Sequence, residues 1–327
     1  MLELPLTVVK ALASRSMRVA AGRVSTMFSG DLLRPGPEVR LPRVDRLYEL
    51  AKRDQWNYTD LRAKDERGID DSLLLPAERE AVARVVSQLY YGERGALLIS
   101  SQLAAMVPDS ESSAFLTSQS FDEARHMEVF SGMARDLHEL APINPCLQVL
   151  LSDLLQTRHL ADKLLGMNLL VEGLALSVFH HMLLVFSRHP RIQGAFGREV
   201  IVEPIENIVR DESRHVGFGV LYLPELVKGL SFRRKAELMA RQLGWMALMY
   251  GSVKLHEKDS ALLGLSFTSV LTKVLEDHQR RAEEMGLSVV LGGRGVHHLL
   301  PVLDSLVNTV FRQHIEVADI DPGREAA

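Results

Sequence analysis

Apolar residues recur along the chain with the three-to-four-residue spacing of amphipathic helices, and proline and glycine mark the joints between these stretches. The alternation of β-branched residues that is typical of strands is absent from the sequence. The pattern therefore predicts an all-α protein. We expect its helices over residues 76–107, 110–140, 148–187 with one break near 158–162, 198–230, 231–260 and 262–286.

The expected helices are long. A helix of 30 residues measures about 45 Å, a length typical of helical bundles. Proline and glycine in residues 188–197 predict a loop there, and a short apolar helix is expected over 296–311. We therefore expect an N-terminal helix or arm over 1–43, one helical domain over 44–290, and a short helix with a polar tail over 291–327.

Composition narrows the class of protein. The chain has 327 residues, of which 46% are hydrophobic, so it has enough apolar material for a core. Its net charge of −4 and the lack of a dense basic block argue against a nucleic-acid partner. The single cysteine, Cys146, excludes an internal disulfide.

The longest charge-free run in the most apolar segment, 173–187, has 15 residues, and a spanning helix needs about 20. These features favour a cytoplasmic protein without a membrane span.

A five-residue motif occurs twice. Residues 122–126 read Asp-Glu-Ala-Arg-His and residues 211–215 read Asp-Glu-Ser-Arg-His, so four of the five positions agree. In both copies a glutamate precedes a histidine by three residues, which places the two side chains on one face of a helix, one turn apart. A carboxylate and an imidazole placed in this way can bind the same metal ion. The two pairs are Glu123 with His126, and Glu212 with His215.

Dinuclear iron sites in helical bundles need one lone glutamate from each of two further helices. Glu93, in Tyr-Gly-Glu-Arg-Gly, lies ahead of the first motif, and Glu172, in Leu-Leu-Val-Glu-Gly-Leu-Ala-Leu, lies ahead of the second. An ionised carboxylate in the apolar surroundings of Glu172 would be costly to bury without a partner, and a metal ion removes that cost. The four glutamates would balance two divalent ions. Unrelated, salt-bridged helix residues are the alternative interpretation.

On these residues the sequence resembles the ferritin-like di-iron carboxylate superfamily, and within it the ribonucleotide reductase small-subunit fold and its ligand-binding oxidases. The resemblance covers about residues 50–230, including the segment Trp56-Asn-Tyr-Thr-Asp-Leu. It implies a bundle with four metal-ligating core helices and additional flanking helices. It also implies two iron ions, or one manganese and one iron. One would be bound by Glu93, Glu123 and His126, and the other by Glu172, Glu212 and His215, with one or more glutamates bridging both.

The resemblance also assigns residues around the ligands. Asp122 and Asp211 match aspartates that accept a hydrogen bond from a ligand histidine. Arg125 and Arg214 would be their buried partners, and Trp56 would lie near Asp211 as an electron-entry residue or as plain packing. Tyr90, one turn before Glu93, is a possible further participant or a buried tyrosine with its hydroxyl satisfied.

Several positions depart from neighbouring branches of the family. Radical-generating small subunits usually carry a tyrosine four residues after the first ligand histidine, and Phe130 stands there. The tail 321–327 has no tyrosine to relay a radical. The valine–tyrosine crosslink of the ligand-binding oxidases is not expected, because Gly95 and Met167 stand near the matching positions. N-oxygenases need an extra histidine where Ile208 stands.

The resemblance implies an oxygen-activating oxidoreductase that oxidises a C–H or N–H bond of a small organic substrate, with dioxygen and a ferredoxin-like electron donor as partners and a homodimer as the assembly. The alternatives are a radical-generating reductase subunit and a non-catalytic iron-binding or storage protein. A hydrophobic substrate is favoured because the positions one turn from the ligands are mostly apolar. These positions are Leu97, Gln119, Met167, Ala175 and Leu176.

Overall fold

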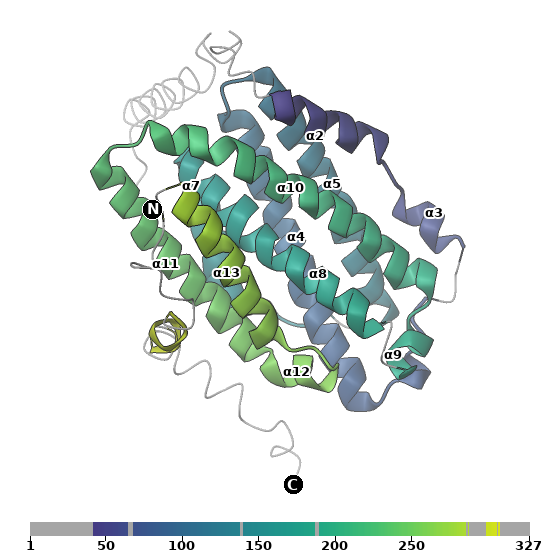
Figure 1. Cartoon of the computed structure of the whole chain (residues 1–327). Coiled ribbons are helices and arrows are strands. Elements are labelled where there is room, and N and C mark those ends of the chain that lie inside the picture. The colour runs from purple at the N-terminus through teal and green to yellow at the C-terminus, as the bar shows by residue number, and fades with distance from the viewer. Residues whose placement is uncertain are drawn as a thin grey trace, which may run out of the picture.

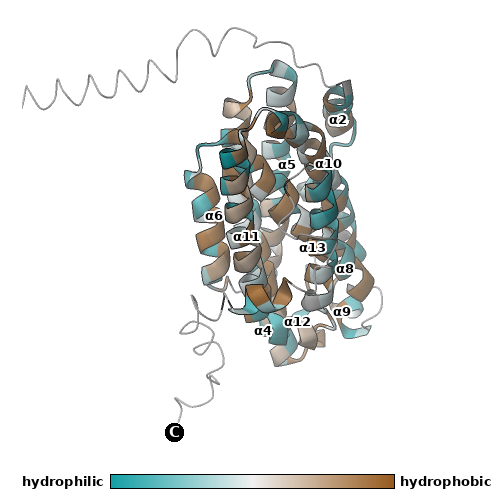
Figure 2. Ribbon diagram, turned by 60° about the vertical axis from the view of Figure 1, so that its left-hand side comes forward, coloured by the Kyte–Doolittle hydropathy of each residue, from teal (hydrophilic) through white to brown (hydrophobic). Residues whose placement is uncertain are grey.

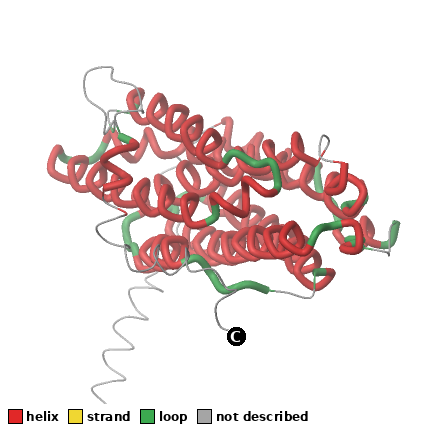
Figure 3. Tube along the Cα trace, turned by 90° about the horizontal axis from the view of Figure 1, so that it is seen from below, coloured by secondary structure: helices red, strands yellow, loops and turns green. Residues whose placement is uncertain are grey.

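The computed structural model describes residues 42–64, 68–137, 140–186, 190–285, 287, 299–305 and 307. Within these residues the chain is helical (Figures 1 and 3), and the single β-bridge, Ile69 to Phe196, belongs to no named strand. The all-α prediction is confirmed. The elements are α2 (Pro42–Arg53), α3 (Tyr58–Arg62), η1 (Asp71–Leu73), α4 (Pro76–Met106), α5 (Ser110–Asp136), α6 (Pro145–Gln156), α7 (Leu160–Leu164), η2 (Leu165–Val171), α8 (Glu172–Phe186), α9 (Pro190–Ala195), η3 (Arg198–Val202), α10 (Glu203–Lys228), α11 (Phe232–Leu255), α12 (Glu257–Leu262) and α13 (Phe267–Glu284).

Local sequence signals set the helix ends. Pro76 is the first residue of α4, and the Glu78 carboxylate accepts a hydrogen bond from the Leu75 backbone N–H at 2.9 Å. Pro108 and Asp109 then separate α4 from α5. The Asp109 side chain caps α5 by accepting a hydrogen bond from the Ser112 N–H at 2.8 Å. The result is a hairpin of two long antiparallel helices.

The four long core elements are α4, α5, the continuous η2–α8 segment and α10. Helices α4 and α5 pack along their lengths, and α10 packs on α5, η2 and α8. Helices α2 and α3 cover α5 and α10 at one edge, while α11 and α13 lie toward the opposite edge (Figure 1). The long helices carry hydrophobic and hydrophilic residues in alternating patches, as amphipathic helices do (Figure 2). This arrangement is the expected bundle of four core helices with flanking helices.

Some expected boundaries were wrong. A loop was expected over 188–197, but Pro190–Ala195 forms α9, because proline suits the first helical turn and Ile192 and Ala195 are buried against the core. The helix expected over 231–260 ends at Leu255, and α12 follows after a one-residue turn. Gly264, with a φ of 71°, makes the turn that leads on to α13.

Two predicted segments lie mostly outside the described residues. Only positions 42 and 43 of the expected N-terminal arm are described, and they begin α2. Of the short helix expected over 296–311, residues 300–305 are helical, and the polar tail is outside the described part of the chain.

One described stretch, Leu160–Val185, is long and apolar enough to cross a membrane by length and composition alone. It comprises α7, η2 and α8, which pack on α4, α10, α11 and α13 and carry Glu172 into the interior. A core helix of a water-soluble bundle passes the same test, so the stretch is weak evidence for a membrane span.

Candidate metal centre

The bundle brings all six residues of the expected ligand set to one place. Each core element contributes to it: α4 provides Glu93, α5 provides the first motif, α8 begins with its glutamate, and α10 provides the second motif. All six side chains belong to residues at most 5% exposed. The six residues are Glu93, Glu123, His126, Glu172, Glu212 and His215.

The ligand atoms form two overlapping groups, in each of which the atoms lie within 4.8 Å of one another. In the first, His126 Nδ1 lies 3.4 Å from Glu93 Oε2, 3.4 Å from Glu123 Oε2 and 3.3 Å from Glu212 Oε1. In the second, His215 Nδ1 lies 3.1 Å from Glu123 Oε1, and Glu172 completes the group.

Two glutamates face both histidines. Glu123 turns one carboxylate oxygen to His126 and the other to His215. Glu212 does the same, with Oε1 near His126 and Oε2 3.8 Å from His215 Nδ1. The sequence assigned Glu123 to one ion and Glu212 to the other and left open which glutamates bridge. The geometry places these two between the histidines, and Glu93 and Glu172 at opposite ends.

Several inward-facing atoms of this cluster have no hydrogen-bond partner among the described residues, although they are buried. They are Glu123 Oε2, His126 Nδ1, Glu212 Oε2 and His215 Nδ1. A buried polar atom without a partner is costly, and native structures rarely leave one unexplained. Here four such atoms converge, and every one is a nitrogen or oxygen lone-pair donor of the kind that iron and manganese accept. The donor set therefore fits two metal ions.

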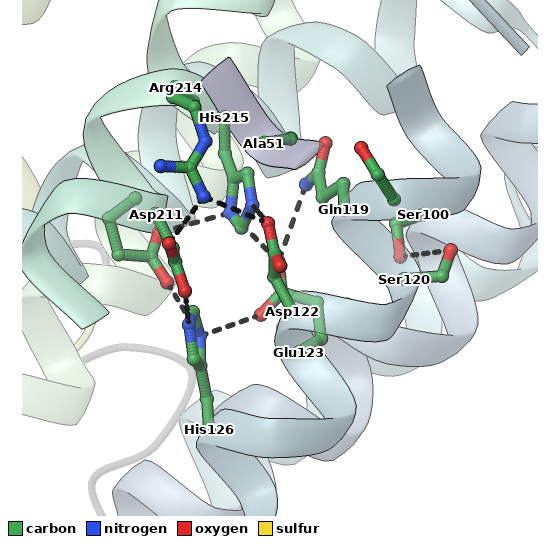
Figure 4. A network of polar contacts seen from close by, with 12 residues as sticks. Ala51, Ser100, Gln119, Ser120, Asp122, Glu123, His126, Asp211, Arg214 and His215 are labelled. Carbon is green, nitrogen blue, oxygen red and sulfur yellow. Dashed lines mark hydrogen bonds and ion pairs between the residues drawn. The ribbon is translucent and has the colours of Figure 1, made fainter. Parts of the chain in front are cut away.

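The outer nitrogen of each histidine meets an aspartate from the opposite motif. His126 Nε2 lies 3.2 Å from Asp211 Oδ2, and His215 Nε2 lies 3.2 Å from Asp122 Oδ2 (Figure 4). Since an aspartate accepts the proton at Nε2, the lone pair of each ring is directed inward at Nδ1. Each motif therefore orients the histidine of the other one.

Two buried arginines join these aspartates. The Arg125 guanidinium contacts Asp122 and lies 3.2 Å from Asp211 Oδ2, while that of Arg214 contacts Asp211 and lies 3.3 Å from Asp122 Oδ2. Trp56 Nε1 donates a hydrogen bond to Asp211 Oδ2 at 2.8 Å. The aspartates and arginines balance one another in charge, so the charge left at the centre is that of the four glutamates.

Burial and neighbouring charges pull the pKa values at the centre apart. Burial raises the pKa of Glu93 and Glu172 well above the ordinary value, outweighing the histidines beside them. Burial also acts to raise the pKa of Glu123, but the positive charges of His215 and His126 outweigh it and lower that pKa. The pKa values of both histidines are raised, because the carboxylates around them outweigh the opposing effect of burial. Without metal, the centre therefore holds protons that metal ions would displace.

Glu172 has additional partners that the sequence did not point to. Gln119 Nε2 donates to its Oε1 at 2.6 Å, and Asn168 Nδ2 lies 3.4 Å from its Oε2. Asn168 Nδ2 also lies 3.1 Å from Gln119 Oε1, so the two amides and the carboxylate form one group. From the sequence, Gln119 was expected to face the substrate instead. Its polar side chain, one turn before Glu123 on the same helix, could have indicated a residue near the ligands.

Asn168 lies in η2, a π-helix that runs directly into Glu172. Glycine at position 219 of α10 allows this segment to come close, since a Cβ there would lie 2.9 Å from Asn168 Cβ and 2.9 Å from Leu169 Cδ2. Short π-helical stretches are frequent at functional sites.

A cavity of about 130 Å³ reaches the centre. Glu93, Glu172 and Glu212 line one part of it, and most of the remaining wall is apolar. Of the positions expected to face a substrate, Met167 and Ala175 line this cavity, whereas Leu97, Leu176 and Gln119 are not among its lining residues.

Two other residues singled out by sequence pack against aromatic neighbours. The Tyr90 ring packs edge-on against Tyr91 with centroids 5.4 Å apart. Phe130, at the position where radical-generating subunits carry tyrosine, is fully buried and stacks on Phe179 at 5.7 Å.

At the level of sequence, no protein-family model and no curated protein gives a match. Solved structures do. A variant of an R2-like ligand-binding oxidase with an anaerobically reconstituted Mn/Fe cofactor aligns with a TM-score of 0.61 and 20% identity over 75% of this chain and 94% of that one. Another variant, with an aerobically reconstituted Fe/Fe cofactor, gives 0.54 and 20% over 81% and 91%.

A second kind of neighbour is a protein from Synechococcus with aldehyde deformylating oxidase activity. It aligns with a TM-score of 0.54 and 22% identity over 70% of this chain and 98% of that one. The fold of this chain is therefore the ferritin-like, R2-like helical bundle, and its interior holds a Glu/His cluster able to bind two metal ions.

Proposed function

We propose that this chain is an oxygen-dependent oxidase with a dinuclear centre of two iron ions, or of one manganese and one iron. The observation that carries the proposal is the convergence of four unpartnered, buried ligand atoms between two histidines whose outer nitrogens meet aspartates. The structural neighbours, which are described as oxidases with Mn/Fe or Fe/Fe cofactors, support it.

Glu93, Glu123, His126 and Glu212 would hold one ion, and Glu123, Glu172, His215 and Glu212 the other. When bound, such a centre would activate dioxygen and so supply the oxidising power for a C–H or N–H bond. The protein fixes the ligands, keeps the histidines in one tautomer through Asp122 and Asp211, and lines most of the cavity with apolar side chains.

Trp56 is the proposed entry for electrons from an external donor. Its indole contacts Asp211, which contacts His126, so a continuous set of polar contacts joins the half-buried tryptophan to the centre. The Arg125 guanidinium lies over the Trp56 ring at 4.8 Å and over the ring of Phe121, which is 57% exposed, at 5.2 Å. A ferredoxin-like donor and a homodimeric assembly are further parts of this proposal.

The test is metal analysis of the purified chain, followed by its reaction with oxygen. After loading with ferrous iron, about two ions per chain and consumption of oxygen on mixing are expected. A chain that binds no more than one ion, or that leaves oxygen unconsumed when fully loaded, contradicts the proposal. Size measurement separates it from iron storage, since a storage protein would form a large shell.

A further inference from the structure

A second, smaller cavity lies beside the one that reaches the metal centre. Its volume is about 20 Å³. Its wall comes from α4, α5, α8, α9, η3 and the turn between α12 and α13, and each wall residue that the structure describes is apolar. All of these residues except Val185 are at most 6% exposed, so the small cavity is an interior one that approaches the surface near Val185.

The small and the large cavity follow one another along two helices. On α4, Val86 lines the small cavity, Val85 lines both cavities, and Glu93 lines the large one. On α8 the order is reversed along the chain, because Met182 lines the small cavity and Val178, one turn earlier, lines the large one. Val85 precedes Glu93 by eight residues, which is about 12 Å along a helix. The shared wall at Val85 therefore separates the small cavity from the space that leads to the metal centre.

The chemistry of the small cavity restricts what it can hold. Protein interiors are packed as densely as organic crystals, and unfilled space loses contacts, so a void needs an explanation. Water is a poor occupant, because a buried water needs several polar partners and the described wall offers none. The volume suffices for one small molecule, and apolar cavities in proteins bind xenon. Dioxygen is likewise small and apolar.

We propose that the small cavity binds dioxygen and delivers it past Val85 to the metal centre. The inference rests on the proposed oxidase function, which needs an organic substrate and dioxygen at one centre. A substrate that fills the large cavity covers the carboxylates in its wall, so dioxygen then needs an approach of its own. The small cavity is too small for such a substrate and too apolar for water, which leaves this approach to the gas.

Xenon tests the site without metal and without turnover. Crystals of the chain pressurised with xenon should show xenon in the small cavity. Val86→Ile adds a methyl group to the wall and should displace it, whereas Ile192→Val removes one and should raise its occupancy. Val227→Ile is the matched control, because Val227 is buried on α10 and is not among the described lining residues of either cavity.

Stopped-flow mixing of the ferrous-loaded chain with oxygen tests delivery. Val86→Ile should lower the second-order rate constant for oxygen several-fold relative to Val227→Ile. Metal content and the limiting rate at high oxygen should stay unchanged, because only the approach of dioxygen is hindered. Dissolved xenon should slow the wild-type reaction by competing with oxygen, and this measurement needs no variant that might fold poorly.

Two outcomes would overturn this inference alone. One is the absence of xenon from the small cavity of the wild type. The other is an oxygen rate constant that neither xenon nor Val86→Ile changes, although xenon occupies the cavity. In both cases oxygen consumption by the loaded wild type leaves the proposed oxidase function standing. A fully loaded wild type that consumes no oxygen overturns the proposed function and this inference together.

Discussion

The two halves of the carboxylate–histidine cluster come from the same five-residue motif, but different surroundings hold them. The His126 side consists of Glu93, His126, Asp211 and Trp56, and its aspartate accepts a hydrogen bond from the indole. The His215 side consists of Glu172, His215, Asp122, Gln119 and Asn168, and its terminal glutamate is bonded to two amides.

The two metal positions differ in the residues that surround them. On the His126 side, a half-buried tryptophan links the outer aspartate toward the surface, while Glu93 has no amide partner among the described residues. On the His215 side, hydrogen bonds hold Glu172 inside the bundle. We therefore expect a rigid position near His215 and an electronically connected one near His126. Two ions bound here would not be equivalent.

Removal of a shared carboxylate should have the largest effect. Glu123→Gln replaces the carboxylate that faces both histidines, and so weakens both metal positions. Metal content is therefore expected to fall from about two ions per chain to fewer than one. Glu93→Gln removes a terminal ligand and should leave the ion near His215 in place. Elemental analysis of both variants after identical loading measures this. Retention of two ions by Glu123→Gln would mean that this carboxylate does not bridge.

The outer aspartates provide a matched pair. Asp122→Asn and Asp211→Asn each disturb one histidine, and each is expected to weaken metal binding about 10- to 100-fold. Only Asp211 also contacts Trp56, so Asp211→Asn and Trp56→Phe should both slow reduction of the loaded centre by a reduced ferredoxin. Trp56→Phe should leave metal affinity nearly unchanged. Metal titration and stopped-flow reduction measure the two effects, and equal reduction rates in all variants would remove Trp56 from the electron path.

The amide partners of Glu172 should have a smaller effect. Gln119→Leu removes the 2.6 Å hydrogen bond to Glu172, so the ion near His215 should be lost more readily to a chelator while the other ion is little affected. Ser120→Ala is the control, since this neighbouring hydroxyl bonds to Ser100 and to the Leu116 carbonyl. Equal chelation rates at both positions in Gln119→Leu would show that the amide does not support Glu172.

A third buried histidine, His278, has no described carboxylate beside it to offset burial, so its pKa shifts in the direction opposite to those of His126 and His215. In the part of the chain that the structure describes, neither ring nitrogen of His278 on α13 has a hydrogen-bond partner, and burial lowers its pKa to about 3. The folded chain keeps it neutral, whereas the unfolded chain takes up a proton below about pH 6.5. Its contribution to stability is therefore lost as pH falls from 6.5 toward 3, by at most about 1.4 kcal/mol per pH unit.

His278→Leu should therefore make stability less sensitive to acid. Denaturant unfolding of both chains at pH 5 and pH 8 measures it, because contributions from the metal centre are common to both and cancel. A constant difference between the chains at the two pH values would mean that His278 titrates normally. Without metal, His126 and His215 should act with the opposite sign, because their raised pKa values favour the protonated folded state at low pH.

Much of the fold followed from sequence, because long amphipathic helices with proline and acidic residues at their starts leave clear periodic signals. The doubled motif brought Glu123 and His126 to one helical face for the same reason, and the apolar neighbours of Glu172 indicated a buried carboxylate. These inferences depend on the spacing of residues within one helix, and this spacing can be read directly from the sequence.

Relations between helices were harder to predict. That Asp122 meets the histidine of the other motif depends on how α5 and α10 face each other, and the amide group around Glu172 depends on η2. Neither has a local pattern. The short helix α9 was missed because a single apolar turn after Pro190 looks like a loop in sequence.

The π-helix η2 can also be understood as a length change. A π-turn holds one residue more than an α-turn, so Leu165–Val171 is equivalent to a single-residue insertion that the helix absorbed without breaking. One residue turns an α-helix by about 100°. Deleting one residue of this segment would restore regular helix and rotate the part of the helix ahead of the deletion by about 100° relative to α8, although no contacting side chain had been substituted. The ligand arrangement at the His215 position therefore depends on the number of residues in this segment as well as on their identity.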